Sequence, residues 1–560
     1  MTELSAIKVL VLDCQASGAT PAYGDLLAMG WAFSGAHVVS PVRDHWIKPR
    51  TTRTISRPVR ELTGWSEAHL AIAQEDSVVW QQLRSELQEH AAGLSVVPTV
   101  IHFARFELGF LRELQARLEP EREFPFDACC LHAISARLYP DLPRRNIRAL
   151  AGFLGHTTDL TRHAGGHVEA SAFIWQALIP QLAEQGVTTW SELQAWLANA
   201  PKATRRTRRV YPLSVERRRE LPDRPGVYRF VRKNESVLYV GKAASLKKRI
   251  AGHFSSRGPS TERGLELLSQ VHAVRFTETP SVLEAALLET DEIKRIDPPY
   301  NVQLRTASRQ AWFATRDFRQ ASASPDAEHT LGPLPSESAL IGLAAWRVLL
   351  DESAAPPPAL CAMILAVPTA FLPPAELFAE GFELTVRELF AGLSGSAAQR
   401  VTRASRALWL ARGRNEREST TEDAPPDQWD LARVRRRLER SLVNGGLVLR
   451  RARLLRLLAD CTLVYRERSM PQARALVIAR AEIVERIDLP LPAASAALLP
   501  VRAVLSLAER RGCFDAASYD RLRVLVTEIR RVEQEGGELA LRIGRHHYAH
   551  ARVLALLQAV

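Results

Sequence analysis

Six polar residues between positions 228 and 301 have side-chain types that together suit the hydrolysis of a phosphate ester. That reaction needs an activated water, positive charge near the phosphorus, and help for the leaving oxygen. A guanidinium supplies a planar pair of donors that matches two phosphate oxygens. Two tyrosine hydroxyls, an ammonium, a carboxylate and a carboxamide accompany it. The six residues are Tyr228, Tyr239, Lys242, Arg249, Glu289 and Asn301.

Four predicted elements must position these side chains. Gly226–Tyr228 and Tyr239–Gly241 are short β-type runs, and the polar, turn-like segment Arg232–Ser236 lies between them. The two runs are therefore expected to pair as a hairpin. The basic amphipathic segment Ser245–His253 carries the guanidinium, and the helix-like stretch Ser281–Ile296 places the carboxylate among apolar residues.

The spacing of these residues is specific. Arg249 follows Tyr239 by ten residues, and Glu289 precedes Asn301 by twelve. On these motifs, residues 221–304 resemble the GIY-YIG nuclease family, and in particular the N-terminal nuclease domain of the UvrC-type excision-repair endonuclease.

The resemblance implies roles for the individual residues. It implies one divalent metal held by the Glu289 carboxylate, with water completing its shell, and hard oxygen ligands suit Mg²⁺ or Mn²⁺. It also implies that Tyr228 accepts a proton, while Tyr239 and Lys242 position water and phosphate. Arg249 is expected to bind the phosphate oxygens.

The first 186 residues have strands before helices, which favours an α/β fold with a mixed sheet. The expected strands are Ala6–Cys14, Leu26–Phe33, His37–Ile47 and Val97–Phe103. The expected helices are Arg105–Arg117, Ala128–Leu138, Ile147–Leu154 and Val168–Leu182.

The segments VLDCQASG, IKPRTTRTISRPVRELTGWS, VIHFARFELGFL and RHAGGHVEAS follow one another in this domain. In order and spacing they resemble the DEDD exonucleases, the epsilon-type proofreading enzymes with a ribonuclease H-like fold. The resemblance implies four carboxylates around two divalent metals, because two close cations require dense negative charge. It assigns Asp13, Gln15, Glu107 and Glu169 to the metal-ligand positions.

The chain departs from that pattern in three places. Gln15 is a neutral amide where a glutamate is usual, and Glu107 is one methylene longer than the usual aspartate. In the last segment, Glu169 is the nearest acid, and either His163 or His167 is a candidate general base, although neither has the usual spacing.

Keeping the usual five-residue spacing instead puts Arg162 at the histidine position and His167 at the aspartate position, which makes a poor metal site. The departures indicate either a modified exonuclease site or an inactive one that binds DNA. Ordinary loop histidines are a further reading of His163 and His167.

Composition restricts the class of partner. The chain has 560 residues and a net charge of +12, so a polyanion is the natural partner, and the nuclease motif favours DNA over an acidic membrane surface. The six cysteines show no metal-ligand spacing, which favours reduced thiols. With neither a signal peptide nor a run of about 18 apolar residues, we expect a cytoplasmic, nucleoid-associated protein.

The rest of the chain carries fewer motifs. A basic run, Lys202–Arg209, is expected to be a linker that also holds DNA through counterion release. Ser322–Ser336 is expected to be a flexible connector. Helices are expected at Thr188–Leu197, Ala339–Asp351, Val386–Arg412 and Tyr519–Glu535, and strands at Cys461–Arg466 and Ala475–Ile487. His546, His547 and His550 are expected to lie on a basic surface helix, with metal binding as the alternative.

The predicted fold class is a multidomain α/β protein: a ribonuclease H-like exonuclease fold, then a small GIY-YIG α/β domain, then a mainly helical α+β C-terminal region. The expected boundaries are 1–186 for the exonuclease-like domain, 187–210 for a helix and linker, 211–305 for the GIY-YIG domain, 306–427 for a helical region and 428–560 for a basic α+β region. No helix-hairpin-helix and no second ribonuclease H-like nuclease are recognisable, so the short, single-incision UvrC homologues are the nearer analogy.

Three functional hypotheses follow. The first is a DNA repair nuclease that nicks DNA with its GIY-YIG domain, using Mg²⁺ or Mn²⁺ and working with excision-repair proteins. The second is a nucleic-acid-binding scaffold whose nuclease folds have lost catalysis. The third keeps 3′–5′ exonuclease action as the main activity.

Overall fold

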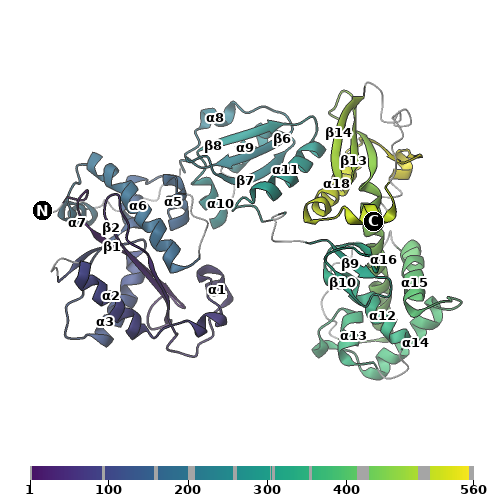
Figure 1. Ribbon diagram of the computed structural model, residues 1–560, viewed down its shortest axis with the longest axis horizontal. Coiled ribbons are helices and arrows are strands. Elements are labelled where there is room, and N and C mark those ends of the chain that lie inside the picture. The colour runs from purple at the N-terminus through teal and green to yellow at the C-terminus, as the bar shows by residue number, and fades with distance from the viewer. Residues whose placement is uncertain are drawn as a thin grey trace. The chain divides into compact units, whose positions relative to one another are not determined.

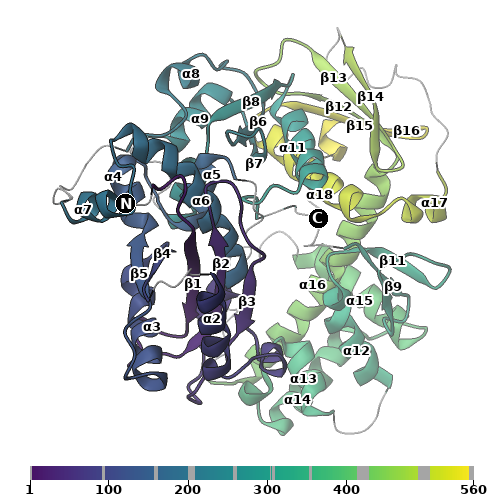
Figure 2. The ribbon, with the colours of Figure 1, turned by 60° about the vertical axis from the view of Figure 1, so that its left-hand side comes forward.

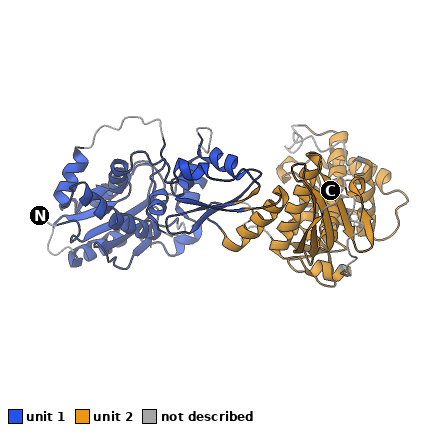
Figure 3. Ribbon diagram, turned by 90° about the horizontal axis from the view of Figure 1, so that it is seen from above, with its two compact units in different colours: residues 1–224, 228–277, 298–300 blue, residues 225–227, 278–297, 301–560 orange. Residues whose placement is uncertain are grey.

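The computed structural model describes residues 3–90, 95–156, 162–199, 209–255, 261–302, 304, 310–351, 356–412, 428–489 and 505–553 (Figure 1). The chain divides into two compact units (Figure 3). Unit 1 contains residues 1–224, 228–277 and 298–300, and unit 2 contains residues 225–227, 278–297 and 301–560. The GIY-YIG segment is therefore shared between the two units.

Unit 1 begins with a five-stranded mixed sheet in the order β3-β2-β1-β4-β5 (Figure 2). The central strand β1 pairs antiparallel with β2 and parallel with β4. The strands are β1 (Val9–Ala16), β2 (Leu26–Ser34), β3 (Arg43–Trp46), β4 (Val97–Ile101) and β5 (Phe126–Cys130). Both faces of β1 are buried, which explains the apolar run of its first four residues, Val9–Leu12.

Helices cover both faces of this sheet. Leu10 and Leu12 face a core shared with α2 and α3, while Val9 and Val11 face a core shared with α4, α5 and α6. Because strand side chains alternate, Asp13 lies in register with the second set. The helices are α1 (Arg57–Thr63), α2 (Asp76–His90), α3 (Ala104–Leu118), α4 (Leu131–Leu138), α5 (Ile147–Leu154), α6 (Ala164–Glu184) and α7 (Trp190–Ala198).

The second part of unit 1 contains most of a three-stranded sheet in the order β7-β6-β8. The expected hairpin is present: Arg232 N–H donates to the Ser236 carbonyl, and Glu235 turns the chain with a φ of 69°. The elements are α8 (Val215–Arg219), β6 (Gly226–Val231), β7 (Val237–Ala243), α9 (Leu246–His253), α10 (Glu262–Leu268) and β8 (Ala273–Glu278).

Unit 2 begins with α11 (Val282–Ile296) and contains a helical part and a sheet part. In the helical part, the sheet β10-β9-β11 shares a core with α12 to α16. Its elements are β9 (Trp312–Thr315), β10 (Ala321–Ser322), β11 (His329–Leu334), α12 (Ile341–Asp351), α13 (Pro358–Leu365), α14 (Ala375–Leu389), α15 (Ala397–Arg412) and α16 (Leu431–Leu458).

The sheet part of unit 2 is an antiparallel sheet in the order β14-β13-β12-β15-β16. One face of this sheet, α11 and α18 share a hydrophobic core that includes Leu283, Leu287 and Leu525. The elements are β12 (Cys461–Arg466), β13 (Ala473–Ala479), β14 (Glu482–Leu489), α17 (Leu507–Gly512), α18 (Ala516–Gln534), β15 (Glu538–Ile543) and β16 (His546–Tyr548).

Several local predictions were wrong. Residues 322–336 do not form a connector, because they contribute to β10 and β11. The single helix expected at Val386–Arg412 is two helices, α14 and α15, separated by a turn with left-handed glycines at positions 392 and 395. His546 and His547 lie in β16 rather than in a helix, since they pair with β15. Most of the basic run Lys202–Arg209 lies outside the described residues.

Candidate active site

The unit 1 half of the GIY-YIG site is built on the hairpin and on α9. Tyr228 lies on β6 and is fully buried, and its hydroxyl is 2.7 Å from Nε2 of His253. Ser245 caps α9, because its hydroxyl accepts a hydrogen bond from the Lys248 N–H. Arg249 and His253 are four residues apart on α9, so they share one face of the helix.

His253 contacts the predicted site residue Tyr228, although the sequence did not single it out. Burial, and then the positive charge of Arg249, lower the pKa of His253 to about 4. The imidazole is therefore neutral near pH 7 and can accept a hydrogen bond from the Tyr228 hydroxyl. In the sequence, the position of His253 four residues after Arg249 in a predicted helix indicates that the two side chains share one face.

A glycine lets the two tyrosines approach each other. A Cβ atom at Gly241 would lie 2.6 Å from the Tyr228 hydroxyl and 2.7 Å from Cε1 of Tyr239. The two phenol rings are 6.1 Å apart between centroids. Tyr239 and Lys242 are half-buried on β7, while Arg249 is exposed on α9. These four predicted residues therefore belong to one short hairpin–helix arrangement in unit 1.

Glu289 and Asn301 belong to unit 2. Glu289 is half-buried on α11, and Asn301 is buried just after it. Asp297, with a left-handed φ of 47°, ends the helix between them. The meeting of all six residues around one metal stays a prediction.

The sheet part of unit 2 holds the first turn of α11. The Glu467 carboxylate accepts hydrogen bonds from the backbone N–H groups of Val282 and Leu283, and so satisfies two free donors of the helix. Buried Glu284 on α11 accepts from Tyr465 and Arg474 at 2.9 and 2.7 Å. Burial, followed by the Glu284 charge, raises the pKa of Tyr465.

The last turns of α11 are held in the same way. Lys294 Nζ lies 2.8 Å from Oδ2 of Asp520 on α18, and both side chains are buried. Arg521 Nε donates to Asp291 at 2.8 Å. The helix that carries Glu289 is thus fixed at both ends by the C-terminal part of the chain.

A second polar site lies at the end of β1 in the exonuclease-like domain. Asp13, Gln15 and Glu107 are all buried, and Glu107 Oε2 accepts a hydrogen bond from the Cys14 N–H at 2.8 Å. His167 Nδ1, on α6, lies 3.2 Å from Oδ2 of Asp13. Burial, followed by the Asp13 charge, raises the pKa of Glu107 well above its usual value.

The structure places His167, not Glu169, against Asp13. Glu169 is exposed two residues further along α6. The Arg162 carbonyl accepts a hydrogen bond from the Gln15 amide at 2.7 Å, and His163 pairs with Asp44 and contacts the Trp46 ring. This arrangement favours the register in which His167 occupies the usual aspartate position.

The donor set at Asp13 fits a pair of divalent metals poorly. Two carboxylates, Asp13 and Glu107, remain, and the other two positions are a neutral amide and an imidazole that faces Asp13. Gln15 Oε1 is buried without a hydrogen bond in the described part of the chain. Among the residues that the structure describes, no cluster of three or more His, Cys, Asp or Glu side chains has the arrangement of a metal site.

The structure thus brings together two groups of polar side chains, one around Tyr228 and one around Asp13. Residues 224–302 match the UvrC-like GIY-YIG domain. The chain therefore contains a UvrC-like GIY-YIG domain.

Known proteins resemble parts of this chain. A Mycobacterium tuberculosis protein named "Putative bifunctional exonuclease/endonuclease protein" is 31% identical over 252 residues, which cover 44% of this chain and 38% of that protein. UvrABC system protein C of Methylococcus capsulatus is 38% identical over 124 residues, or 21% of this chain and 20% of that protein.

A solved structure also resembles the GIY-YIG segment. The GIY-YIG N-terminal endonuclease domain of UvrC from Thermotoga maritima, bound to magnesium, is 30% identical, with a TM-score of 0.14, and covers 16% of this chain and 93% of that domain. The chain spans less than half the length of the curated relatives it matches. In the described part of the chain, no helix has the length and apolar composition to span a membrane.

Proposed function

We propose that this chain is a DNA repair endonuclease that nicks DNA with its GIY-YIG domain in a reaction that depends on Mg²⁺ or Mn²⁺. The family match of residues 224–302 carries the proposal, and the contact between Tyr228 and His253 beside Arg249 supports it. The net charge of +12 suits a DNA substrate. The match to UvrABC system protein C suggests excision-repair proteins as partners on nucleoid DNA.

In this proposal, the side chains of unit 1 bind the phosphate and prepare the water. Arg249 is exposed on α9 and binds two oxygens of the scissile phosphate. His253 accepts the hydroxyl hydrogen of Tyr228, which fixes the direction of that O–H bond. With a pKa of about 4, His253 is too weak a base to take the proton near pH 7, so it orients Tyr228.

The proposed metal is held by Glu289 on α11. A carboxylate is a hard oxygen ligand that suits Mg²⁺ or Mn²⁺, and Asn301 adds a carboxamide close by in the sequence. Such a cation would stabilise the charge that develops on the phosphate oxygens.

A plasmid-nicking assay tests this function. Purified protein with Mn²⁺ is expected to convert supercoiled DNA to the nicked form, and Arg249→Ala or Glu289→Gln is expected to lower the rate at least 100-fold, as for a lost transition-state contact. Lys248→Ala is the matched control, because it removes an exposed cation from the same helix. Equal nicking by the wild type and both site variants would refute the assignment.

For the exonuclease-like domain, the structure favours DNA binding over catalysis. His167 lies where a carboxylate is usual and contacts Asp13, so the negative charge required by two metals is missing. A duplex labelled at its 3′ end should therefore keep its length in the presence of Mn²⁺. Shortening by the wild type that Asp13→Ala abolishes would restore exonuclease action as an activity of this chain.

A further inference from the structure

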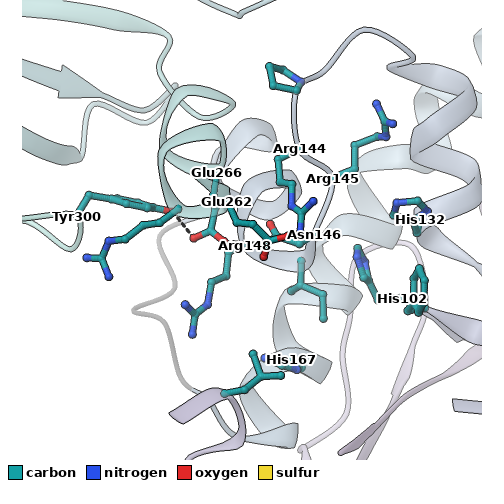
Figure 4. Close-up of a pocket in the computed structure, with 15 residues that line it drawn as sticks. His102, His132, Arg144, Arg145, Asn146, Arg148, His167, Glu262, Glu266 and Tyr300 are labelled. Carbon is teal, nitrogen blue, oxygen red and sulfur yellow. Dashed lines mark hydrogen bonds and ion pairs between the residues drawn. The ribbon is translucent and has the colours of Figure 1, made fainter. Parts of the chain in front are cut away.

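A pocket of about 790 Å³ in unit 1 is lined by residues of both nuclease-like domains (Figure 4). One wall is the segment 143–148, which leads into α5, and another is α10 with Tyr300. His102, His132 and His167 also line the pocket, and His167 lies 3.2 Å from Asp13 (Figure 4). Its volume is that of a site for a small ligand or for one or two nucleotides.

The two domains dock firmly around this pocket. The Arg144 N–H donates to Ser269 Oγ at 3.0 Å, and the Asn146 amide donates to Glu266 at 2.6 Å. At the same interface, a Cβ on Gly152 would lie 1.8 Å from Oε1 of buried Gln270. The walls are therefore closely packed before any ligand binds.

The pocket is cationic. Four guanidinium groups, those of Arg144, Arg145, Arg148 and Arg263, line it together with two carboxylates. Both carboxylates already have partners, because Glu262 pairs with Arg144 at 2.6 Å and Glu266 accepts from the Tyr300 hydroxyl at 2.6 Å. The arginines are therefore only partly neutralised.

Two of these arginines have donors to spare. Within the part of the chain that the structure describes, Arg148 has no anionic partner, and Arg263 donates to the Pro299 carbonyl at 3.1 Å and lies over the Tyr300 ring. Arg145 is different, because its Nη1 donates to three backbone carbonyls and so supports the wall.

Buried donors without partners point to the same ligand. Nε of Arg144 and Nε of Arg145 are N–H donors that are buried without a hydrogen bond within the described residues. A group rich in acceptors, such as a phosphodiester, satisfies unpaired N–H donors of this kind.

We propose that this pocket binds the phosphate backbone of one nucleic-acid strand without a divalent metal, with Arg148 and Arg263 contacting the same strand. The two arginines come from different nuclease-like domains, so a strand held here passes from one domain to the other. The proposal rests on the proposed function only for the identity of the ligand as a nucleic acid. It gives the exonuclease-like domain a role that does not require its carboxylates.

Binding of a fluorescein-labelled single-stranded oligodeoxynucleotide to the full chain in EDTA tests this site. Arg148→Gln and Arg263→Gln should each weaken binding about tenfold. Each should also make the slope of log K against log salt concentration less negative by about 0.7, which is the change for one lost phosphate contact on a single strand. Their effects should be non-additive in the double variant, since both contact one strand. Arg122→Gln is the control, an exposed arginine on the same unit outside the pocket.

Each remaining outcome decides the proposal. If both pocket variants, folded by circular dichroism, bind like Arg122→Gln, the pocket is not the site. If deoxynucleoside monophosphate competes as well per molecule as the oligonucleotide, the site binds free nucleotides and the proposal of a strand is wrong. If the wild type does not nick DNA, the proposed function is wrong but the proposed strand-binding site is not affected. The two outcomes are separable because the binding assay contains no metal and measures no cleavage.

Discussion

The buried ion pair between Lys294 and Asp520 gives a direct test of whether the C-terminal part of the chain holds the helix of Glu289. The two groups are 2.8 Å apart, and their side chains are 9% and 0% exposed. The perturbation is Lys294→Met, which keeps the length and apolar stem of the side chain and removes the charge.

The expected cost comes from the charge that remains. Breaking a buried pair typically costs about 3–5 kcal/mol, because the other ion stays desolvated. Arg523 lies 4.0 Å from Asp520 and is 42% exposed, so it compensates in part. We therefore expect a loss near the lower end, about 3 kcal/mol, which lowers the melting temperature of a domain of 150–250 residues by roughly 6–12 °C.

The assay is thermal and denaturant unfolding of the full chain, followed by titration of Mg²⁺ in the nicking reaction. Arg387→Met is the matched control, because Arg387 and Glu383 form an exposed pair on α14 worth about 0.3–0.5 kcal/mol. Lys294→Met should also need more Mg²⁺ for half-maximal nicking, because α11 carries Glu289. If Lys294→Met unfolds like Arg387→Met, the reasoning about this pair is wrong.

Three other predictions follow from single contacts. His253 should be neutral above about pH 4, so the rate of nicking should stay constant down to about pH 5, and an acid limb near pH 6.5 in the pH–rate profile would contradict this. The free energy of unfolding should fall as the pH drops from 6.5 to 4, because His253 takes up a proton in the unfolded chain before it does so in the folded one. His253→Gln should slow nicking roughly tenfold. Gly152→Ala should destabilise unit 1 by about 1–3 kcal/mol through overpacking. Gly252→Ala is the control, because a Cβ there meets open space on α9, and equal melting curves for the two variants would contradict the prediction. Gln15→Glu with His167→Asp should create Mn²⁺ binding measurable by calorimetry, and a silent titration would count against the inferred register.

Local pattern predicted the elements that position the candidate site. The hairpin of β6 and β7, helix α9 and helix α11 were all expected within three residues of their observed bounds, because each has clear periodicity and polar boundaries. Strand β5 was missed because its five residues run directly into α4, and the two were read as one helix. Helix α2 was missed as well, since its apolar residues are separated by a long polar face.

The sequence did not predict which side chains from distant segments would be in contact. His167 lies 154 positions from Asp13, and neither spacing nor residue type decided between His167 and Glu169 as its neighbour. The sequence places His253 one helical turn after Arg249, which is a local sign that the two side chains share a face. The lowered pKa of His253 and its contact with Tyr228 depend on burial, which only the fold shows. The pairing of side chains thus required the fold, although their chemistry did not.

The C-terminal part of the chain shows why the remaining function was not readable from motifs. Its contribution to α11 consists of ordinary residues, Glu467, Tyr465, Arg474 and Asp520, each of which would pass for a surface or core residue in the sequence. Their shared role, which is to hold α11, becomes visible only when the fold buries them against that helix. Because an unpaired charge in that core costs several kcal/mol, these contacts fix the axis of α11 more firmly than its own helix propensity does. A region without catalytic motifs therefore sets the position of the carboxylate on which the proposed metal depends.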